Sequence, residues 1–219
     1  MRLFIIASLL LAAAGCASGM SKDECLYADW RAIGFEDGAA GRDATAVSQR
    51  RVACAEKAGV TPDMQAYLSG RDEGLDQFCR PANGFDVGSR GLRYTGVCQA
   101  RGETAFVAAY EKGLTLHGLV SNLDAASRAL ARANTDLDNV EHQIAHSQAA
   151  IVNPATPNPE RIDHLAEMKT LYQRRDKIRD SIPRLARDVD FAEAELEDFR
   201  AEVESQEFAR SARPLDASY

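Results

Sequence analysis

The chain has 219 residues, a formal net charge of −7 and a sequence pI of about 5.2. Hydrophobic residues make up 45% of it and aromatic residues 7%, which is enough apolar material for a core and fits packed helices better than a β-sandwich. Nonspecific nucleic-acid binding depends on cationic patches, so the acidic balance argues against it, and we expect no nucleic-acid partner.

Residues 1–15 have the features of a cleaved export signal. A charged start precedes an apolar run at 3–14, which is shorter than the about 20 apolar residues that a membrane-spanning helix needs. This run and the small residues after it are typical of a secretory signal peptide. The string Leu-Ala-Ala-Ala-Gly-Cys at 11–16 is similar to a lipobox, so we expect lipidation at Cys16.

The alternative is an ordinary signal peptide cut after Ala14 or Ala17, and a lipobox most often has leucine where Ala13 stands. Each buried lipid CH₂ contributes about 0.8 kcal/mol, so several acyl chains on Cys16 would form an almost permanent membrane anchor. The residue after Cys16 is Ala17 rather than Asp, which resembles outer-membrane sorting. The sequence therefore predicts an outer membrane lipoprotein that faces the periplasm of a bacterial cell envelope, with a linker at 16–24.

Four further cysteines lie in residues 25–113, which we interpret as a small disulfide-stapled helical domain. In an exported domain of this size they predict two disulfides, with three possible connectivities. Short turns between sequential helices bring neighbours together, so we favour the pairs Cys25–Cys54 and Cys79–Cys98. A zinc site is the alternative, but the chain has no CxxC pair and no histidine before His117.

Glycines and aromatic residues recur in this domain at helical spacing. Glycines three or four residues apart share a helix face and let another backbone approach closely, so we predict short, tightly packed helices. The string Thr61-Pro62-Asp63 predicts a helix start, with a capping hydroxyl and a proline in the first turn. Acids stand among the glycines, and because the EF-hand pattern is absent we interpret them as a solvated helix face rather than a calcium site. These acids are Glu36, Asp37, Asp72, Glu73, Asp76 and Asp86.

The order of aromatics, glycines and cysteines in this domain resembles a known family. The segment Tyr67-x-x-Gly70-x-x-x-Gly74-Leu75-x-x-Phe78-Cys79 is followed by Gly84, Gly88, Gly91 and Cys98, and then by Phe106-x-x-x-Tyr110-x-x-Gly113. This arrangement is similar to bacterial lipoproteins catalogued as domain of unknown function 2799, over about residues 25–115 and with the lipidated leader. The resemblance implies an envelope lipoprotein without a known activity, and it transfers no catalytic residues.

Residues 114–209 carry two heptad seams that predict a long antiparallel coiled-coil hairpin. The apolar seam residues follow steps of three and four, first from Leu116 to Ile151 and then from Met168 to Val203. Between the seams, three prolines in the turn region at 152–160 break any helix. The sequence therefore predicts an all-α fold in which a stapled helical domain is followed by this hairpin.

We expect the two helices to run from about Glu103 to Ile151 and from about Glu160 to Phe208, each about 73 Å long at 1.5 Å per residue. Pro183 is expected to kink the second helix, and residues 210–219 are expected to form a disordered tail. Small residues in the seams supply little buried area. Two interpretations remain open. Either a partner or a second copy packs against the thin hairpin and adds to its buried area, or the hairpin is self-contained and serves only as a spacer.

Two groups in the hairpin could bind a ligand. His142 and His146 lie four residues apart on one helix face and could hold a metal ion, but they lie off the seam and a third ligand is not obvious. The basic run at 174–179 could contact lipid head groups or an acidic partner, although intervening acids favour a solvated helix face. We therefore expect no metal.

The chain has no GxSxG, Walker or HExxH motif, and its cysteine-containing domain has no histidine. We expect no enzyme activity, no catalytic residue and no cofactor. The leading hypothesis is a lipid-anchored interaction protein whose hairpin binds another envelope protein or a second copy of itself. The alternative is an accessory or regulatory subunit of a cell-wall or outer-membrane enzyme that acts through residues 25–113.

Overall fold

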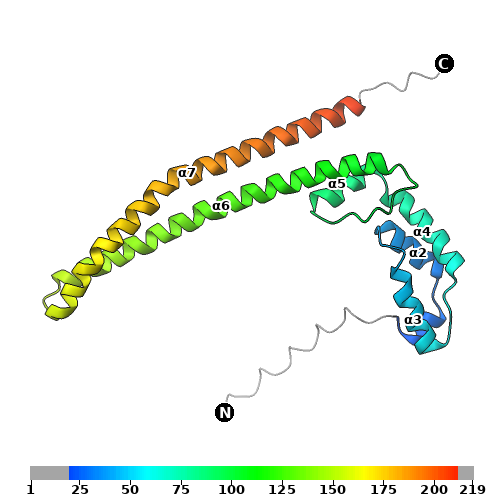
Figure 1. Ribbon diagram of the computed structural model, residues 1–219, viewed down its shortest axis with the longest axis horizontal. Helices are drawn as coiled ribbons and strands as arrows, with labels where there is room; N and C mark the ends of the chain where they lie inside the picture. Colours follow the sequence, from blue (N-terminus) through cyan, green and yellow to red (C-terminus); the bar gives the residue numbers. More distant parts are fainter. Residues whose placement is uncertain (1–19, 212–219) are drawn as a thin grey trace, which may run out of the picture. The chain divides into compact units, whose positions relative to one another are not determined.

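The structure is a computed structural model that describes the backbone of residues 20–211 and the side chains of residues 20–205. The predicted signal peptide, Cys16 and residues 212–219 of the predicted tail lie outside the described residues. Within them the chain forms seven α-helices and no β-strand, which confirms the predicted all-α fold class. The helices, shown in Figure 1, are α1 (Lys22–Leu26), α2 (Trp30–Ala39), α3 (Ala46–Ala58), α4 (Met64–Phe78), α5 (Pro81–Ser89), α6 (Glu103–Val152) and α7 (Asn158–Ser211).

The chain divides into two compact units, Met1–Leu114 and Thr115–Tyr219, so the boundary falls inside α6. The described part of the first unit contains α1 to α5 and the start of α6, and the second unit contains the rest of α6 and α7. None of the helices in residues 20–211 combines the length and the hydropathy of a membrane-spanning segment.

In the first unit, α2 and α4 pack with their backbones in direct contact. A methyl group added to Gly38 would lie 2.2 Å from the carbonyl oxygen of Arg71, and one added to Gly74 would lie 2.2 Å from that of Phe35. Both separations are far shorter than any van der Waals contact, so only glycine fits at either position. The predicted close approach of helices through their glycine faces is confirmed.

A second helix pair, α5 and the start of α6, repeats this arrangement. A methyl group added to Gly88 would lie 2.1 Å from the backbone carbonyl oxygen of Tyr110, and one added to Gly113 would lie 2.2 Å from that of Phe85. In both pairs a left-handed glycine follows two residues after the end of the first helix, Gly41 in one pair and Gly91 in the other, with φ of 65° and 66°. We call α2 with α4 the first helix pair, and α5 with the start of α6 the second helix pair.

One disulfide closes each helix pair. Cys25 is bonded to Cys54 and Cys79 to Cys98, one of the three possible connectivities. In both cases the bond joins the segment that precedes the first helix of the pair to the segment that precedes the second. The four cysteines are buried, and each disulfide belongs to a separate hydrophobic cluster of the unit. The cluster around Cys79–Cys98 also contains Leu75 and Phe78 of α4, so it joins the second pair to the first.

Side-chain caps set where several of these helices begin. Asp29 accepts hydrogen bonds from two backbone amides at the start of α2, and Ser21 and Glu24 form a capping box on α1. The helix α4 begins at Met64, with the Asp63 carboxylate as its cap. The predicted start at Thr61 was therefore two residues too early, because the carboxylate of Asp63, and not the Thr61 hydroxyl, accepts the hydrogen bond from the first turn.

In the second unit, α6 and α7 form the predicted antiparallel hairpin. The helices pack through Val140, Ile144 and Leu171, and Gln148 donates a 2.9 Å hydrogen bond to the Tyr172 hydroxyl. Every predicted seam residue from Leu116 to Val203 is buried or half-buried, which confirms the heptad seams.

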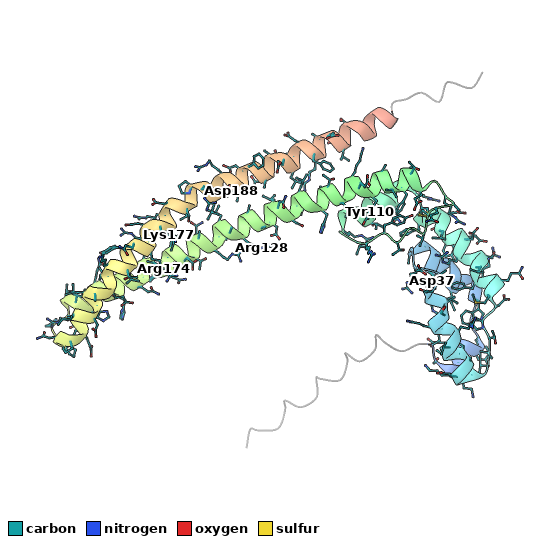
Figure 2. All side chains as sticks on the ribbon, in the orientation of Figure 1. Asp37, Tyr110, Arg128, Arg174, Lys177 and Asp188 are labelled. Carbon is teal, nitrogen blue, oxygen red and sulfur yellow. A yellow bond between two sulfur atoms is a disulfide. The ribbon has the colours of Figure 1, made fainter. Side chains whose placement is uncertain are left out.

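The described helix α7 continues through Pro183. Figure 1 shows that α7 curves along its length. Figure 2 shows Arg174 and Lys177 in the part of α7 nearer the turn and Asp188 further along it. The charges of α7 are therefore distributed along a single continuous helix.

We expect removal of either disulfide to destabilise the first unit by about 3 kcal/mol, because each one restricts the unfolded chain by closing a loop. The double variants Cys25→Ser with Cys54→Ser and Cys79→Ser with Cys98→Ser should each lower the urea midpoint of unfolding. The paired design leaves no odd thiol. A midpoint equal to that of the wild type would show that the bond does not support its helix pair.

Candidate functional site

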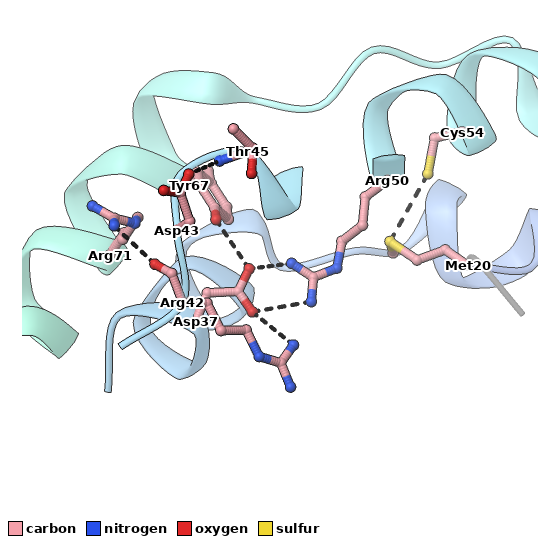
Figure 3. A network of polar contacts seen from close by, with 9 residues as sticks. All are labelled: Met20, Asp37, Arg42, Asp43, Thr45, Arg50, Cys54, Tyr67 and Arg71. Atoms are coloured by element: carbon pink, nitrogen blue, oxygen red, sulfur yellow. Dashed lines mark hydrogen bonds and ion pairs between the residues drawn. The ribbon is translucent and has the colours of Figure 1, made fainter. Parts of the chain in front are cut away.

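The most unusual side chain of the first unit is Asp37, which lies in the last turn of α2 and is only 1% exposed. Its carboxylate accepts a 3.0 Å hydrogen bond from the Tyr67 hydroxyl of α4. Arg50 of α3 donates to both carboxylate oxygens, and Arg42 donates to one of them at 3.2 Å. Figure 3 shows these four side chains converging from three helices and the turn after α2. We call them the Asp37 network.

Burial on its own raises the pKa of the Asp37 carboxyl, but the hydrogen bonds from Arg50 and Tyr67 outweigh it and hold the pKa below its ordinary value of 3.8. The bond to Asp37 raises the pKa of Arg50. Burial and the same carboxylate raise the pKa of Tyr67 to about 12. Asp37 is therefore charged and Tyr67 is neutral at neutral pH.

The interpretation of the acids in this unit as a solvated helix face was wrong for Asp37. The other five acids of the predicted face, Glu36, Asp72, Glu73, Asp76 and Asp86, are exposed. Asp37 lies three residues after Gly34 and next to Gly38, and therefore on the face of α2 that packs against α4. Its position directly before one contact glycine and three residues after another was the signal that could have identified it as buried, since Glu36 lies between the same glycines and is exposed.

Comparison of the two helix pairs shows that the fold does not require this network. The residue before the contact glycine is Asp37 in the first pair and Val87 in the second. One turn earlier in each first helix, Gly34 and Gly84 pack against a backbone carbonyl of the facing helix. That carbonyl belongs to Tyr67 in the first pair and to Phe106 in the second. Val87 and Phe106 are buried and apolar. Because an apolar pair fills the same place in the second copy, the buried charge of the first copy is an additional feature.

A cleft of about 370 Å³ lies beside the network and shares Arg42 with it. Phe78 and Val87 supply apolar surface, while Arg90 and Arg93 line it from the second helix pair. Asp43, Thr45, Gln49, Tyr94 and Thr95 also line it. The cleft is therefore built from both helix pairs of the first unit.

The arginines of this cleft outnumber its acids. Arg42 shares the single carboxylate of Asp37 with Arg50, and Arg90 is paired with Asp86 at 2.7 Å. Arg93 takes part in no ion pair with any described residue. Guanidinium groups suit carboxylates and phosphates because their planar N–H donors match those oxygens. The arrangement can therefore bind an anionic group, although the sequence did not predict it.

The sequence-predicted site residues are placed as follows. Cys16 lies outside the described residues, and the other four cysteines are in disulfides. His142 and His146 are exposed, as predicted. The His146 ring lies 5.8 Å from the ring of His164, an approach that the sequence analysis did not foresee. In the part of the chain that the structure describes, no three His, Cys, Asp or Glu side chains gather to hold a metal ion.

The basic run at 174–179 lies on α7 and is mostly exposed. Arg175 pairs with Asp176 and stacks 4.8 Å above the ring of Tyr172. Arg179 reaches Glu141 of α6 at 3.4 Å. The run is therefore tied in part to its own hairpin.

Residues 29–115 match the family model described as Protein of unknown function (DUF2799). The matched segment contains both helix pairs and all of the cleft, and the resemblance inferred from the sequence is confirmed over it. Neither the curated proteins nor the solved structures contain a match to this chain. The family description assigns no activity to the segment.

We expect the Tyr67→Phe variant to change how stability depends on pH. Because the fold raises the pKa of Tyr67 to about 12 from 10.0, the neutral phenol stabilises the protein below pH 10. This contribution is lost as the pH rises through 10 toward 12. The wild-type free energy of unfolding should therefore fall more steeply than that of the variant between about pH 10 and about pH 12.

Urea unfolding at several pH values provides this measurement. At neutral pH the variant should lose about 1 kcal/mol, the usual net value of one hydrogen bond. Parallel pH profiles for the two proteins would contradict the placement of the Tyr67 hydroxyl against the Asp37 carboxylate.

Proposed function

We propose that this chain is a lipid-anchored protein of the bacterial envelope that acts by binding another envelope component through its helical hairpin, without catalysing a reaction. The observation that carries the proposal is the surface of the hairpin. Large apolar side chains remain exposed on it, among them Ile162 and Phe191, each 65% exposed, and Leu165 at 58%. A helix that were only a spacer would gain nothing from exposing them.

Export and anchoring rest on the leader and on the disulfides. Disulfides persist in oxidising compartments such as the periplasm, and two are present in the first unit. The lipobox-like string ending at Cys16 favours a lipid anchor, and Ala17 after it favours the outer membrane. We propose the periplasmic face of the outer membrane as the location.

A second candidate function is an accessory or regulatory role of the first unit toward a cell-wall or outer-membrane enzyme. The arginine-lined cleft favours it, because the buried Asp37 network fixes Arg42 at the rim of a cavity that could receive an anionic group of a partner. The two candidates place the binding surface in different units, so one experiment separates them.

We expect capture of partners from solubilised envelopes to depend on the hairpin. The bait is the full chain, compared with a version that lacks residues 117–208 and with an Arg42→Gln, Arg93→Gln variant. Loss of specific partners only in the shortened version supports the hairpin, whereas loss only in the arginine variant supports the accessory role. Identical partners for all three baits would contradict both.

We expect labelled palmitate to be incorporated into the wild-type chain and not into a Cys16→Ser variant, because the thiol of Cys16 is the proposed site of lipid attachment. The variant should also leave the membrane fraction. Equal labelling of the two proteins would contradict the lipid anchor, and it would leave the binding role of the hairpin to be judged by the capture experiment.

A further inference from the structure

The charges of residues 169–204 of α7 separate into two bands of opposite sign. Residues 169–187 contain seven basic and two acidic side chains, whereas residues 188–204 contain one basic and eight acidic side chains. We call these the basic band and the acidic band. Figure 2 shows Arg174 and Lys177 of the basic band and Asp188 of the acidic band on one continuous helix. A helix that is merely solvated has no need for such a division.

Most of these charges form no ion pair with a described side chain of the hairpin. Arg179 bonds to Glu141, Arg175 to Asp176, and Arg184 to Asp188 at 3.6 Å. The charged residues of the two bands without an ion pair to any described residue are Lys169, Arg174, Lys177, Asp180, Arg187, Asp190, Glu193, Glu195, Glu197, Asp198, Arg200 and Glu204.

Like charges also crowd within each band. Glu193 and Glu197 lie four residues apart, a spacing at which like charges destabilise a helix. A partner that brings the opposite charge to each band would remove this repulsion. The required partner has an acidic stretch and a basic stretch, in the reverse order.

A second copy of this hairpin meets that requirement. The basic and acidic bands are about 28 Å and about 25 Å long at 1.5 Å per residue, so their lengths match. If two copies lie antiparallel about a two-fold axis, each basic band faces the acidic band of the other copy. A parallel pair would instead place like charges together.

One stripe of α7 locates the axis. Lys177, Arg184, Phe191 and Asp198 are spaced by seven residues and therefore lie on one side of the helix. All four are exposed, and Phe191 is 65% exposed although it is the one large apolar side chain among them. An axis near Phe191 brings its ring against its own copy and places Arg184 opposite Asp198, so that residues 178–187 of each basic band face residues 195–204 of the other copy's acidic band.

We propose that the hairpin forms a homodimer in which the α7 helices of two copies pair antiparallel, with their charge bands crossed and Phe191 at the centre. This inference rests on the proposed role of the hairpin and names its partner as a second copy of the chain. The interface is isologous, because the same surface is used by both copies. An anionic membrane surface could attract the basic band, but it would repel the adjacent acidic band.

The test uses residues 20–219, exported so that both disulfides form, in sedimentation equilibrium at several salt concentrations. The screening length falls from about 30 Å at 0.01 M salt to about 3 Å at 1 M. We expect a dimer at low salt whose dissociation constant rises at least about tenfold at high salt. A protein that is monomeric under all conditions would overturn the proposal.

Charge reversal tests the crossing of the bands. A basic-band variant carries Lys177→Glu, Arg184→Glu and Arg187→Glu, and an acidic-band variant carries Glu197→Lys, Asp198→Lys and Glu204→Lys. After these changes the altered band of each variant contains four basic and five acidic side chains and has lost almost all of its net charge. Each variant alone should dimerise at least about tenfold more weakly than the wild type. An equimolar mixture should associate more tightly than either variant alone, because the unaltered basic band of one faces the unaltered acidic band of the other. A variant that dimerises as tightly as the wild type, or a mixture that associates no more tightly than the separate variants, would overturn the proposal.

A matched control carries Lys22→Glu, Arg51→Glu and Arg80→Glu in the first unit, which changes the net charge by the same amount as the basic-band variant. It should dimerise like the wild type. Circular dichroism checks that all variants keep their helices, which is expected because the substituted residues are exposed.

Cross-linking tests the orientation. Oxidation should link two copies through Phe191→Cys, which lies near the axis, and not through Lys169→Cys, which lies far from it. Linking through both positions would indicate a parallel pair and overturn the crossed arrangement. Binding of the wild type to anionic vesicles that is lost in the basic-band variant, without a dimer, would assign the basic band to a membrane instead.

Failure of the dimer and failure of the proposed function give different results. If the protein is monomeric but the hairpin-dependent partners are still captured, only the inference of a second copy is contradicted. If neither is observed, the hairpin has no binding role.

Discussion

Direct contact between helix backbones is the constraint on which the first unit depends. At Gly38 and at Gly88, the space that a methyl group would need is occupied by the carbonyl oxygen of the facing helix. Glycine costs about 1 kcal/mol in a helix relative to alanine, and the chain accepts that cost at several positions. In return, the distance between the paired helices is small enough for two short helices to bury their surfaces with few large side chains.

The same constraint explains why the disulfides and the Asp37 network lie where they do. Helices that touch through glycine supply little apolar surface, so each pair adds a buried disulfide and a few large residues to its core. In the first pair, a charged hydrogen-bonded group also fills space that valine and phenylalanine fill in the second. Breaking a buried ion pair leaves an uncompensated charge, so the network fixes its members in one arrangement.

The sequence predicted most of the fold because the relevant signals are local and periodic. The seam from Leu116 to Ile151 repeats every seven residues, and a second seam of the same period follows the proline-containing turn, so the two helices are expected to pair. The spacing of Gly34 and Gly38 indicates a close approach of two helix backbones. The start of α4 was missed by two residues, because Thr61 and Asp63 can both cap a helix and only the backbone path decides between them.

The candidate site was not predicted, for a physical reason. The arginines of the cleft come from two turns about 50 positions apart in the sequence, and no period relates Arg42 to Arg93. Asp37 stands in the sequence between the same two glycines as Glu36, which is exposed. Asp37 is buried because it lies on the face of α2 that meets α4. The charge bands of α7, by contrast, are visible in the sequence, although only the unbroken helix makes them one surface.

Alanine replacement of single glycines measures the backbone contact most directly. The account predicts that Gly38→Ala and Gly88→Ala each lower the free energy of unfolding by about 1–3 kcal/mol, because an added methyl group overpacks the contact. Gly118 of α6 has nothing within 4 Å of its added methyl group, so Gly118→Ala should raise that free energy by about 0.5–1 kcal/mol through helix propensity. If Gly38→Ala and Gly88→Ala stabilise the protein as Gly118→Ala does, the helices do not touch and the account is wrong.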